Sequence, residues 1–160
     1  MTQMSRPPRR RSKATATGAK AAPRPRYVLE QQIGFVMRVA MQRHTVIFMS
    51  RMIAGLTQTQ FAALAKLADV GPCSQNQLGR LIYLDAATTK GVVDRLQVRR
   101  LISVCPDPHD RRRRAIALTP AGRAIAGDAA QVALQITRQT LAPLTAAEQK
   151  SALRLLKKLI

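Results

Sequence analysis

The chain has 160 residues, of which 46% are apolar and 22% charged, a balance typical of one globular domain with a hydrophobic core rather than a disordered chain. Lys and Arg outnumber Asp and Glu by 27 to 8, and the net charge of +19 favours nucleic acid as partner, with an anionic membrane surface second. The sequence shows neither a membrane-spanning run nor a secretory signal, which favours the cytoplasm.

Residues 1–26 differ in composition from the rest of the chain. They hold eight basic residues, no acidic residue and four prolines, which predicts a disordered basic arm. The arm either follows DNA phosphates or acts as a solubilising tail, and it also weakly resembles an organelle transit sequence. The remaining residues still carry a net charge of +11, so the basic character extends into the folded part.

Apolar residues recur every three to four positions over residues 27–56, which predicts one helix of about 25 to 30 residues. A domain of this size cannot cover so long a helix, and we expect its apolar face to pack against a second copy. His44 interrupts that face, Arg51 follows two turns later, and Met41 and Phe48 lie beside them. This apolar slot with cationic ends suits a small aromatic carboxylate, but a hydrogen-bonded core His44 and a solvated Arg51 explain the pattern equally well.

Polar residues mark the helix starts in the middle of the chain. Thr57, Ser74 and Asp85 each precede an apolar stripe and are good N-cap residues. The two short helices after Ser74 and Asp85 form a helix-turn-helix pattern. On the second of them Ala86 is expected inside, together with Val92, Val93 and Leu96. The residues expected outside are Ala87, Thr88, Thr89, Lys90 and Arg95.

A hairpin and two further helices complete the pattern. The β-prone runs 101–105 and 115–118 flank a turn that ends in four arginines, which predicts a hairpin with a cationic tip. Thr119 and Thr145 then cap helices, the first running to about Leu141. The predicted fold is therefore mainly α, with six helices and a two-stranded wing.

This order of elements resembles the MarR (multiple antibiotic resistance regulator) family of bacterial transcription factors. The resemblance covers residues 27–160 and is carried by LTQTQF at 56–61, LGRL at 78–81, VVDRL at 92–96, DPHDRR at 107–112 and LTPAG at 118–122. It implies an obligate homodimer joined by helices in 27–56 and 119–160, with a winged helix-turn-helix in 57–118. It also implies a cytoplasmic repressor of double-stranded DNA with a palindromic operator, released by a small aromatic acid.

The resemblance and the geometry of DNA grooves together predict the DNA contacts. The first turns of a reading helix meet base edges in the major groove, and an arginine at a wing tip enters the minor groove, a role we assign to Arg112 with Asp110 orienting it. The alternative is that Thr88 and Thr89 are merely solvated. The predicted contact residues are Ser74, Gln75, Asn76, Ala87, Thr88, Thr89, Lys90, Arg95, Arg111, Arg112 and Arg113.

The resemblance also bears on the ligand and on the end of the reading helix. The family's pocket lies between the first helix and the reading head, which adds Arg38 and Tyr83 to the ligand-binding residues predicted from the apolar slot, Met41, His44, Phe48 and Arg51. Where the family commonly has glycine, this chain has Arg99 and Arg100. Either the helix exits differently, or Arg100 tolerates a strained backbone.

The remaining chemistry is sparse. The sequence holds only two histidines, His44 and His109, and no catalytic triad, which argues against an enzyme, and we expect no metal or cofactor. Cys73 and Cys105 lack zinc-site spacing, but a thiol-responsive regulator of the same fold stays open as an alternative. A nonspecific architectural DNA-binding protein is the other alternative, favoured by the net charge.

Overall fold

The computed structural model describes residues 26–107, 110, 112 and 114–160, and within them the chain is mainly α-helical with one two-stranded antiparallel sheet. The expected arm, apart from Arg26, and the residues His109, Arg111 and Arg113 lie outside the described residues. No helix in the described part is both long and apolar enough to cross a bilayer. The elements are η1 (Leu29–Gln31), α1 (Ile33–Arg51), η2 (Ile53–Gly55), α2 (Gln58–Val70), α3 (Gln75–Leu81), α4 (Ala86–Val98), β1 (Ile102–Pro106), β2 (Arg114–Leu118), α5 (Pro120–Leu141) and α6 (Ala146–Leu156).

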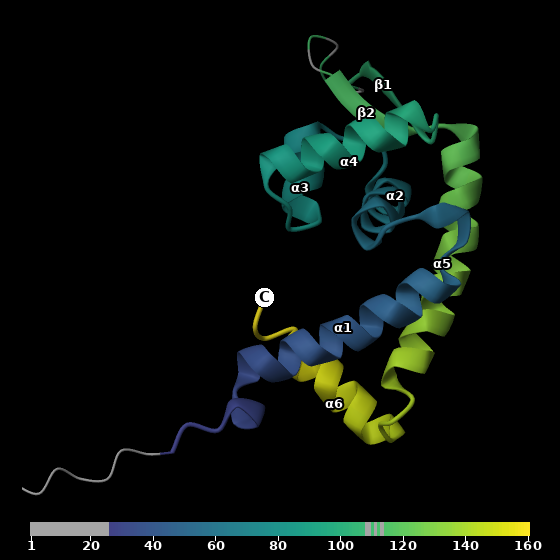
Figure 1. The fold of residues 1–160 in the computed structure, drawn as a ribbon. Coiled ribbons are helices and arrows are strands. Elements are labelled where there is room, and N and C mark those ends of the chain that lie inside the picture. Colours follow the sequence, from purple (N-terminus) through teal and green to yellow (C-terminus); the bar gives the residue numbers. More distant parts are fainter. Residues whose placement is uncertain (1–25, 108–109, 111, 113) are drawn as a thin grey trace, which may run out of the picture.

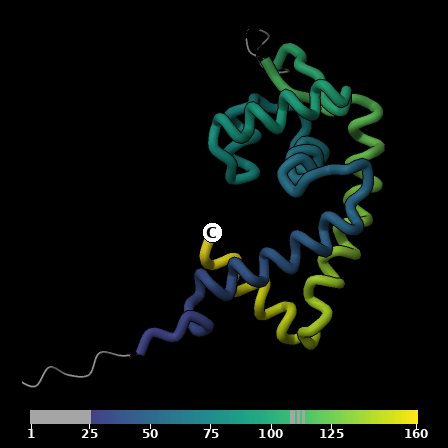
Figure 2. Tube along the Cα trace, in the orientation of Figure 1, coloured from purple at the N-terminus to yellow at the C-terminus, as the bar shows by residue number. Residues whose placement is uncertain are grey.

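The helices gather at two ends of the molecule, and α5 runs between them (Figure 1). One end contains α2, α3, α4 and the hairpin, and the other contains α1, the C-terminal half of α5 and α6. The Cα trace in Figure 2 shows the chain leaving α1, forming the whole first group and returning along α5. This arrangement separates the helix-turn-helix from the terminal helices α1, α5 and α6.

The helix starts are set by the side chains that the sequence indicated. Thr57, Ser74, Asp85, Thr119 and Thr145 each accept a hydrogen bond from the backbone N–H three residues on. At Thr57 and Thr145 the side chain three positions on also bonds back to the cap residue, which completes a capping box. The five predicted caps are confirmed. They could be predicted because the hydrogen bond of a cap joins residues that are close in the sequence.

The prediction of one continuous helix over residues 27–56 was wrong. The helix α1 has 19 residues, because Gln32 and Met52 at its two ends adopt extended backbone conformations. After Met52 the chain passes through Ala54 and Gly55, both with positive φ, before α2. The apolar spacing continues across this break because Met52 is itself partly buried, so periodicity alone could not reveal it.

Two hydrophobic cores hold the described residues together. The larger one joins α2, α3, α4, the hairpin and α5, and the smaller one joins α1 to α5 through Ile47, Phe48 and Ile136. Met52 and Phe61 pack against both cores and so connect them. The most deeply buried leucines of the larger core are Leu56, Leu64, Leu67, Leu78 and Leu96.

The hairpin pairs Ile102 with Leu118 at one end and Pro106 with Arg114 at the other. The strands therefore begin or end one residue away from the predicted runs. Cys73, in the loop before α3, forms a bridge with Ile116 on the outer side of β2. This bridge fixes the loop before α3 to the middle of strand β2.

The junction of α4, the wing and α5 is tightly packed. Arg100 has φ of 57°, so it tolerates the left-handed conformation that a glycine would adopt more easily. The hydroxyl of Thr119 donates to the Arg100 carbonyl at 2.8 Å, and the Thr119 backbone N–H donates to Leu101 at 3.1 Å. A Cβ atom on Gly122 would lie 1.8 Å from the Leu101 carbonyl oxygen, so only glycine fits there.

The substitution Gly122→Ala should therefore destabilise the protein by about 2 kcal/mol or more, because the added methyl group forces the backbone of Leu101 to move. The control is Gly127→Ala in the same helix, where nothing lies within 4 Å of the added atom. That change should stabilise the protein by about 0.5 to 1 kcal/mol. Urea unfolding at one protein concentration measures both, and equal effects would contradict the packing described.

Candidate nucleic-acid interface

The start of α4 is held by a network between Asp85 and Thr88. One carboxylate oxygen of Asp85 accepts the Thr88 backbone N–H at 2.8 Å, and the other accepts the Thr88 hydroxyl at 2.6 Å. The hydroxyl and then the N–H hold the pKa of the Asp85 carboxyl below its usual value. The cap is therefore ionised at neutral pH, as suits the positive end of a helix.

The exposed side of α4 carries most, but not all, of the residues predicted there. Ala87, Thr88, Lys90 and Arg95 are exposed. Thr89 is only 1% exposed, which corrects its prediction as a base contact.

The burial of Thr89 follows from its position and its hydrogen bond. It precedes Val92 and Val93 by three and four residues, so it continues their buried stripe, whereas Ala86 lies exposed. The Thr89 hydroxyl donates to the Asp85 carbonyl at 2.7 Å, which satisfies its polar group inside the protein. The sequence pattern placed Thr89 on the outside of α4 because threonine is a polar residue type.

The helices α3 and α4 cross at Gly79. A Cβ atom at this position would lie 2.7 Å from the Thr89 hydroxyl oxygen and 3.2 Å from the Leu84 carbonyl oxygen. The missing side chain therefore permits the close crossing. A small cleft of about 310 Å³ opens between the two helices and is lined by Gln75, Asn76, Gly79, Arg80, Leu84, Ala86 and Thr89.

The entrance to α3 carries the residues predicted to contact phosphates. Ser74 and Gln75 are half-buried, and Asn76 is exposed beside the cleft. Arg80, which the sequence analysis missed, also lines this cleft and is exposed. Its position one turn after Asn76 on the same helix was the signal that could have identified it.

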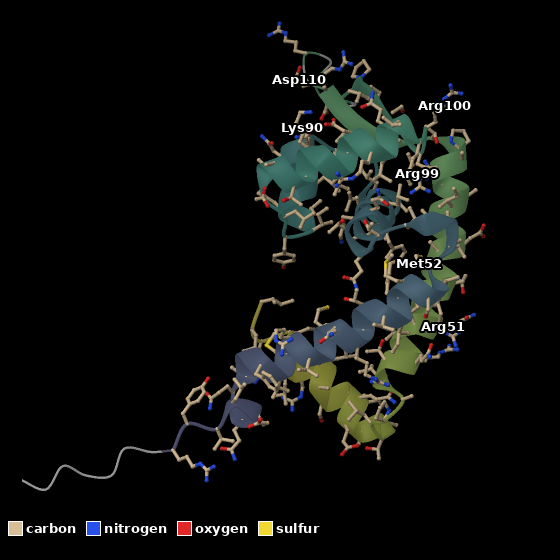
Figure 3. All side chains as sticks on the ribbon, in the orientation of Figure 1. Arg51, Met52, Lys90, Arg99, Arg100 and Asp110 are labelled. Carbon is tan, nitrogen blue, oxygen red and sulfur yellow. The ribbon has the colours of Figure 1, made fainter. Side chains whose placement is uncertain are left out.

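Cationic side chains lie at the same end of the molecule. Lys90 forms an ion pair of 2.6 Å with Asp94, both exposed, which contributes about 0 to 1 kcal/mol and so does not prevent exchange for a phosphate. Figure 3 shows Lys90 on α4 and Asp110 at the wing, both at this end. Asp110 accepts a hydrogen bond from the backbone N–H of Arg112 at 3.0 Å, and Arg112 is exposed.

A second cavity lies away from this surface, among α1, α5 and α6. It is an apolar groove of about 540 Å³. Met41 and His44, both predicted as ligand-binding, line this groove. Its residues are Met37, Ala40, Met41, Arg43, His44, Thr137, Thr140, Leu141, Pro143, Leu144, Leu153 and Leu156.

The other predicted ligand-binding residues are not brought to the groove. Phe48 is 4% exposed and lies in the smaller core, where its ring faces those of His44 and Phe61. Arg38 has its guanidinium over the Phe35 ring, 5.1 Å from the centroid. The remaining two, Arg51 and Tyr83, are exposed outside the groove.

A polar cluster forms part of the groove wall. Nδ1 of His44 lies 2.9 Å from the Thr140 hydroxyl, and the Arg43 guanidinium donates to the Thr140 carbonyl at 2.8 Å. The sequence analysis missed Arg43 and Thr140. Thr140 is 96 residues from His44, so no local pattern could have joined them.

The helix-turn-helix, the hairpin after it and the exposed cationic residues of both define a winged helix-turn-helix DNA-binding protein. The model of the MarR family matches residues 54–113. The transcriptional repressor NicR of Pseudomonas putida is 37% identical over 150 residues, which cover 93% of this chain and 95% of NicR. The chain belongs to the MarR family, and it is a DNA-binding transcriptional regulator rather than an enzyme.

Two solved structures are similar over most of the chain. A probable transcriptional regulator of Pseudomonas aeruginosa is 50% identical, with a TM-score of 0.80 over 83% of this chain and 100% of that one. BpsR of Bordetella bronchiseptica, whose DNA binding is regulated by 6-hydroxynicotinic acid, is 38% identical. Its TM-score is 0.79 over 84% of this chain and 96% of BpsR. The six helices and the wing therefore form a MarR-like fold.

The lowered pKa of Asp85 predicts how its cap responds to acid. The ionised cap stabilises the fold fully above the pKa of an unfolded Asp, about 3.9, and this stabilisation is lost as the pH falls through the lower folded value. Asp85→Asn keeps a capping oxygen but cannot titrate. The stability advantage of the wild type over Asp85→Asn should thus be constant above about pH 5 and shrink below about pH 4. Urea unfolding across this range measures it, and a constant difference down to about pH 2 would contradict the cap described.

Proposed function

We propose that the chain is a sequence-specific repressor that binds a palindromic operator as a homodimer and is released by a small aromatic acid. The observation that carries the DNA-binding part is the exposure of Ala87, Thr88 and Lys90 on the first turns of α4, together with that of Arg112 in the hairpin. The proposal divides the chain into terminal helices for dimerisation, in 27–56 and 119–160, and a DNA-binding region, 57–118.

Exposed apolar side chains support the dimer. Leucines of α6 are about half exposed, and no residue of α6 is buried, although the helix is amphipathic. A single chain rarely leaves so much apolar surface in water, and a two-fold interface would cover it. The large apolar residues exposed on the terminal helices and the C-terminal end outside the groove are Ile33, Val36, Val39, Val46, Met49, Leu134, Leu155, Leu159 and Ile160. The exposed Met37, Met41, Leu153 and Leu156 line the groove itself.

The proposed contacts divide by what they read. Thr88 uses its hydroxyl proton for the Asp85 cap, so it offers its methyl group to a thymine, while Lys90 reaches a guanine. Ser74, Gln75 and Asn76 donate to phosphate oxygens, which positions the protein without specifying sequence. Arg112 enters an A·T-rich minor groove. Arg95 is a further proposed contact, as are Arg111 and Arg113, which lie outside the described residues.

This function is tested with a duplex that the protein enriches from a random pool, called here the selected duplex. The wild type should prefer it over random duplex by about 10³ or more and protect two half-sites one helical turn apart. With about four to six phosphates neutralised per subunit, the slope of log affinity against log salt should be about −7 to −11. Arg112→Ala should weaken binding at least about tenfold, roughly 1.4 kcal/mol.

The control is Arg138→Ala, which removes the same charge from the far end of α5 and should leave binding unchanged. Unchanged affinity in Arg112→Ala would remove the wing from the proposal. Equal binding of selected and random duplexes would favour the architectural alternative.

The effector part is supported by the groove and by the relatives. A groove of about 540 Å³ lies in the range that suits a small ligand, and its apolar wall would face an aromatic ring. We place the carboxylate at the polar cluster of Arg43, His44 and Thr140. The regulation of BpsR by 6-hydroxynicotinic acid favours a pyridine carboxylate among aromatic acids.

The effector is tested by thermal unfolding against 6-hydroxynicotinate, nicotinate and benzoate. A ligand at about 100 times its dissociation constant adds roughly 2.7 kcal/mol of stability, which is a visible shift. The shift should be absent in His44→Phe, which keeps an aromatic ring but loses the hydrogen bond to Thr140. The same acid should release the wild type from the selected duplex. Failure of all three acids, with DNA binding intact, would contradict this part.

The thiol-responsive alternative is disfavoured by the surroundings of Cys73. Burial, and then the negative charge of Asp107, raise the pKa of the Cys73 thiol. The protonated thiol is a poor nucleophile toward oxidants. Cys105 is half-buried and directs its thiol toward the Ala115 carbonyl.

A further inference from the structure

The C-terminal end of α4 is tied to a distant segment by Arg99. Its guanidinium donates one hydrogen bond to the Ala54 carbonyl and a second, at 3.5 Å, to the Gln60 side-chain oxygen. Figure 3 shows Arg99 beside the segment that follows Met52 at the end of α1. The side chain thus links the reading helix to the connection between α1 and α2.

Both acceptors of Arg99 are held in place by their own surroundings. Ala54 has φ of 53° and Gly55 has φ of 57°, so the chain turns sharply here, and Leu56 is buried directly afterwards. The Gln60 side chain is 5% exposed and its oxygen also accepts the Thr57 backbone N–H at 3.1 Å in the capping box of α2. Arg99 therefore hydrogen-bonds to acceptors whose positions are fixed by their own contacts.

Other polar side chains of α4 make no comparable connection among the residues that the structure describes. The bonds of Thr88 and Thr89 stay at the start of α4, and Lys90 pairs with Asp94 one turn on. Among the described residues, Arg99 is thus the polar side chain that ties the end of α4 to η2 and the start of α2, which follow α1 in the chain. A planar guanidinium with two acceptors fixes direction as well as distance, which a flexible ammonium does less well.

We propose that Arg99 is a positioning residue that sets the angle of α4 relative to α1, and thereby the separation of the two reading heads on DNA. The inference rests on the proposed function, in which α1 belongs to the dimer and α4 enters the major groove. Half-sites one turn apart require a separation of about 34 to 36 Å, so an error in this angle misplaces the second head. Arg99 then contributes to operator selection without touching DNA.

The experiment compares Arg99→Gln and Arg99→Lys with Arg100→Gln. The control removes the same charge one residue away, at a side chain that is exposed and for which no hydrogen bond is seen among the described residues. Each protein is titrated by fluorescence anisotropy, over a range of salt, with the selected duplex, a random duplex, and the selected duplex with two base pairs inserted between its half-sites. Stoichiometric titration gives the active fraction of each variant.

We expect the wild type and Arg100→Gln to lose at least about 30-fold in affinity on the insertion, because it moves and rotates one half-site. Arg99→Gln should bind the selected duplex about tenfold more weakly and lose less than about threefold on the insertion, since its heads are no longer held at one separation. Its salt slope should stay at the wild-type value, whereas loss of a phosphate contact lowers the slope by about 0.9 per contact. Arg99→Lys, which keeps one donor for Ala54, should be intermediate.

Four results would overturn the inference. If Arg99→Gln loses as much affinity on the insertion as the wild type does, the hydrogen bonds of Arg99 do not set the separation of the reading heads. If Arg99→Gln shows a reduced salt slope and loses the same affinity for the selected and the random duplex, Arg99 is a phosphate contact. If it loses the same affinity for both duplexes at an unchanged slope, Arg99 acts only in folding. If the wild type itself does not prefer the selected duplex, the proposed function fails and this inference with it.

Discussion

The close contact between Gly79 and Thr89 decides which side of α4 faces solvent. Because Gly79 has no side chain, the Thr89 hydroxyl lies against α3 and bonds to the Asp85 carbonyl, so the buried stripe begins at Thr89 and continues through the valines of α4. A helix turns by about 100° per residue, and a shift of one residue would replace Thr89 by Lys90 in that contact. Burial of the Lys90 ammonium group there without a partner would cost too much free energy for this arrangement to be populated. The set of side chains available to DNA is therefore fixed by a contact on the opposite side of the helix.

The exit of α4 transmits this orientation to the wing. The left-handed conformation of Arg100 costs about 1 kcal/mol relative to glycine, and the hydrogen bonds that Thr119 makes to Arg100 and Leu101 offset it. These bonds place the start of α5 directly against the base of β1, where Gly122 admits the Leu101 carbonyl. The wing, α4 and α5 consequently meet at one rigid point, and α5 continues from there to Ile136 in the smaller core.

What the sequence predicted well was local, and what it missed depends on tertiary structure. Caps such as Thr57 and Asp85 are readable because donor and acceptor lie three residues apart. Thr89 was misplaced because its polar group is satisfied within its own helix, so it buries like an apolar residue. The end of α1 at Met52 was missed because both sides of the break pack against the cores. In the groove, the pairing of His44 with Thr140 joins residues on different helices, and only the complete fold brings them together.

The same architecture constrains how an effector in the groove could release DNA. A ligand shifts an equilibrium only by its difference in affinity for two states, so the groove must differ in shape between them. The residues of α4 proposed to face DNA are held by the hydrogen bonds of Asp85 and Thr89 and cannot supply that difference locally. Displacement of α1 against α5 can supply that difference, because Phe48 of the smaller core contacts the ring of His44, which lines the groove, and Met52 packs against both cores. Close-packed interiors transmit such a shift rather than absorb it, and Met52, two residues before the Ala54 carbonyl that Arg99 binds, offers a route to the proposed DNA-binding region.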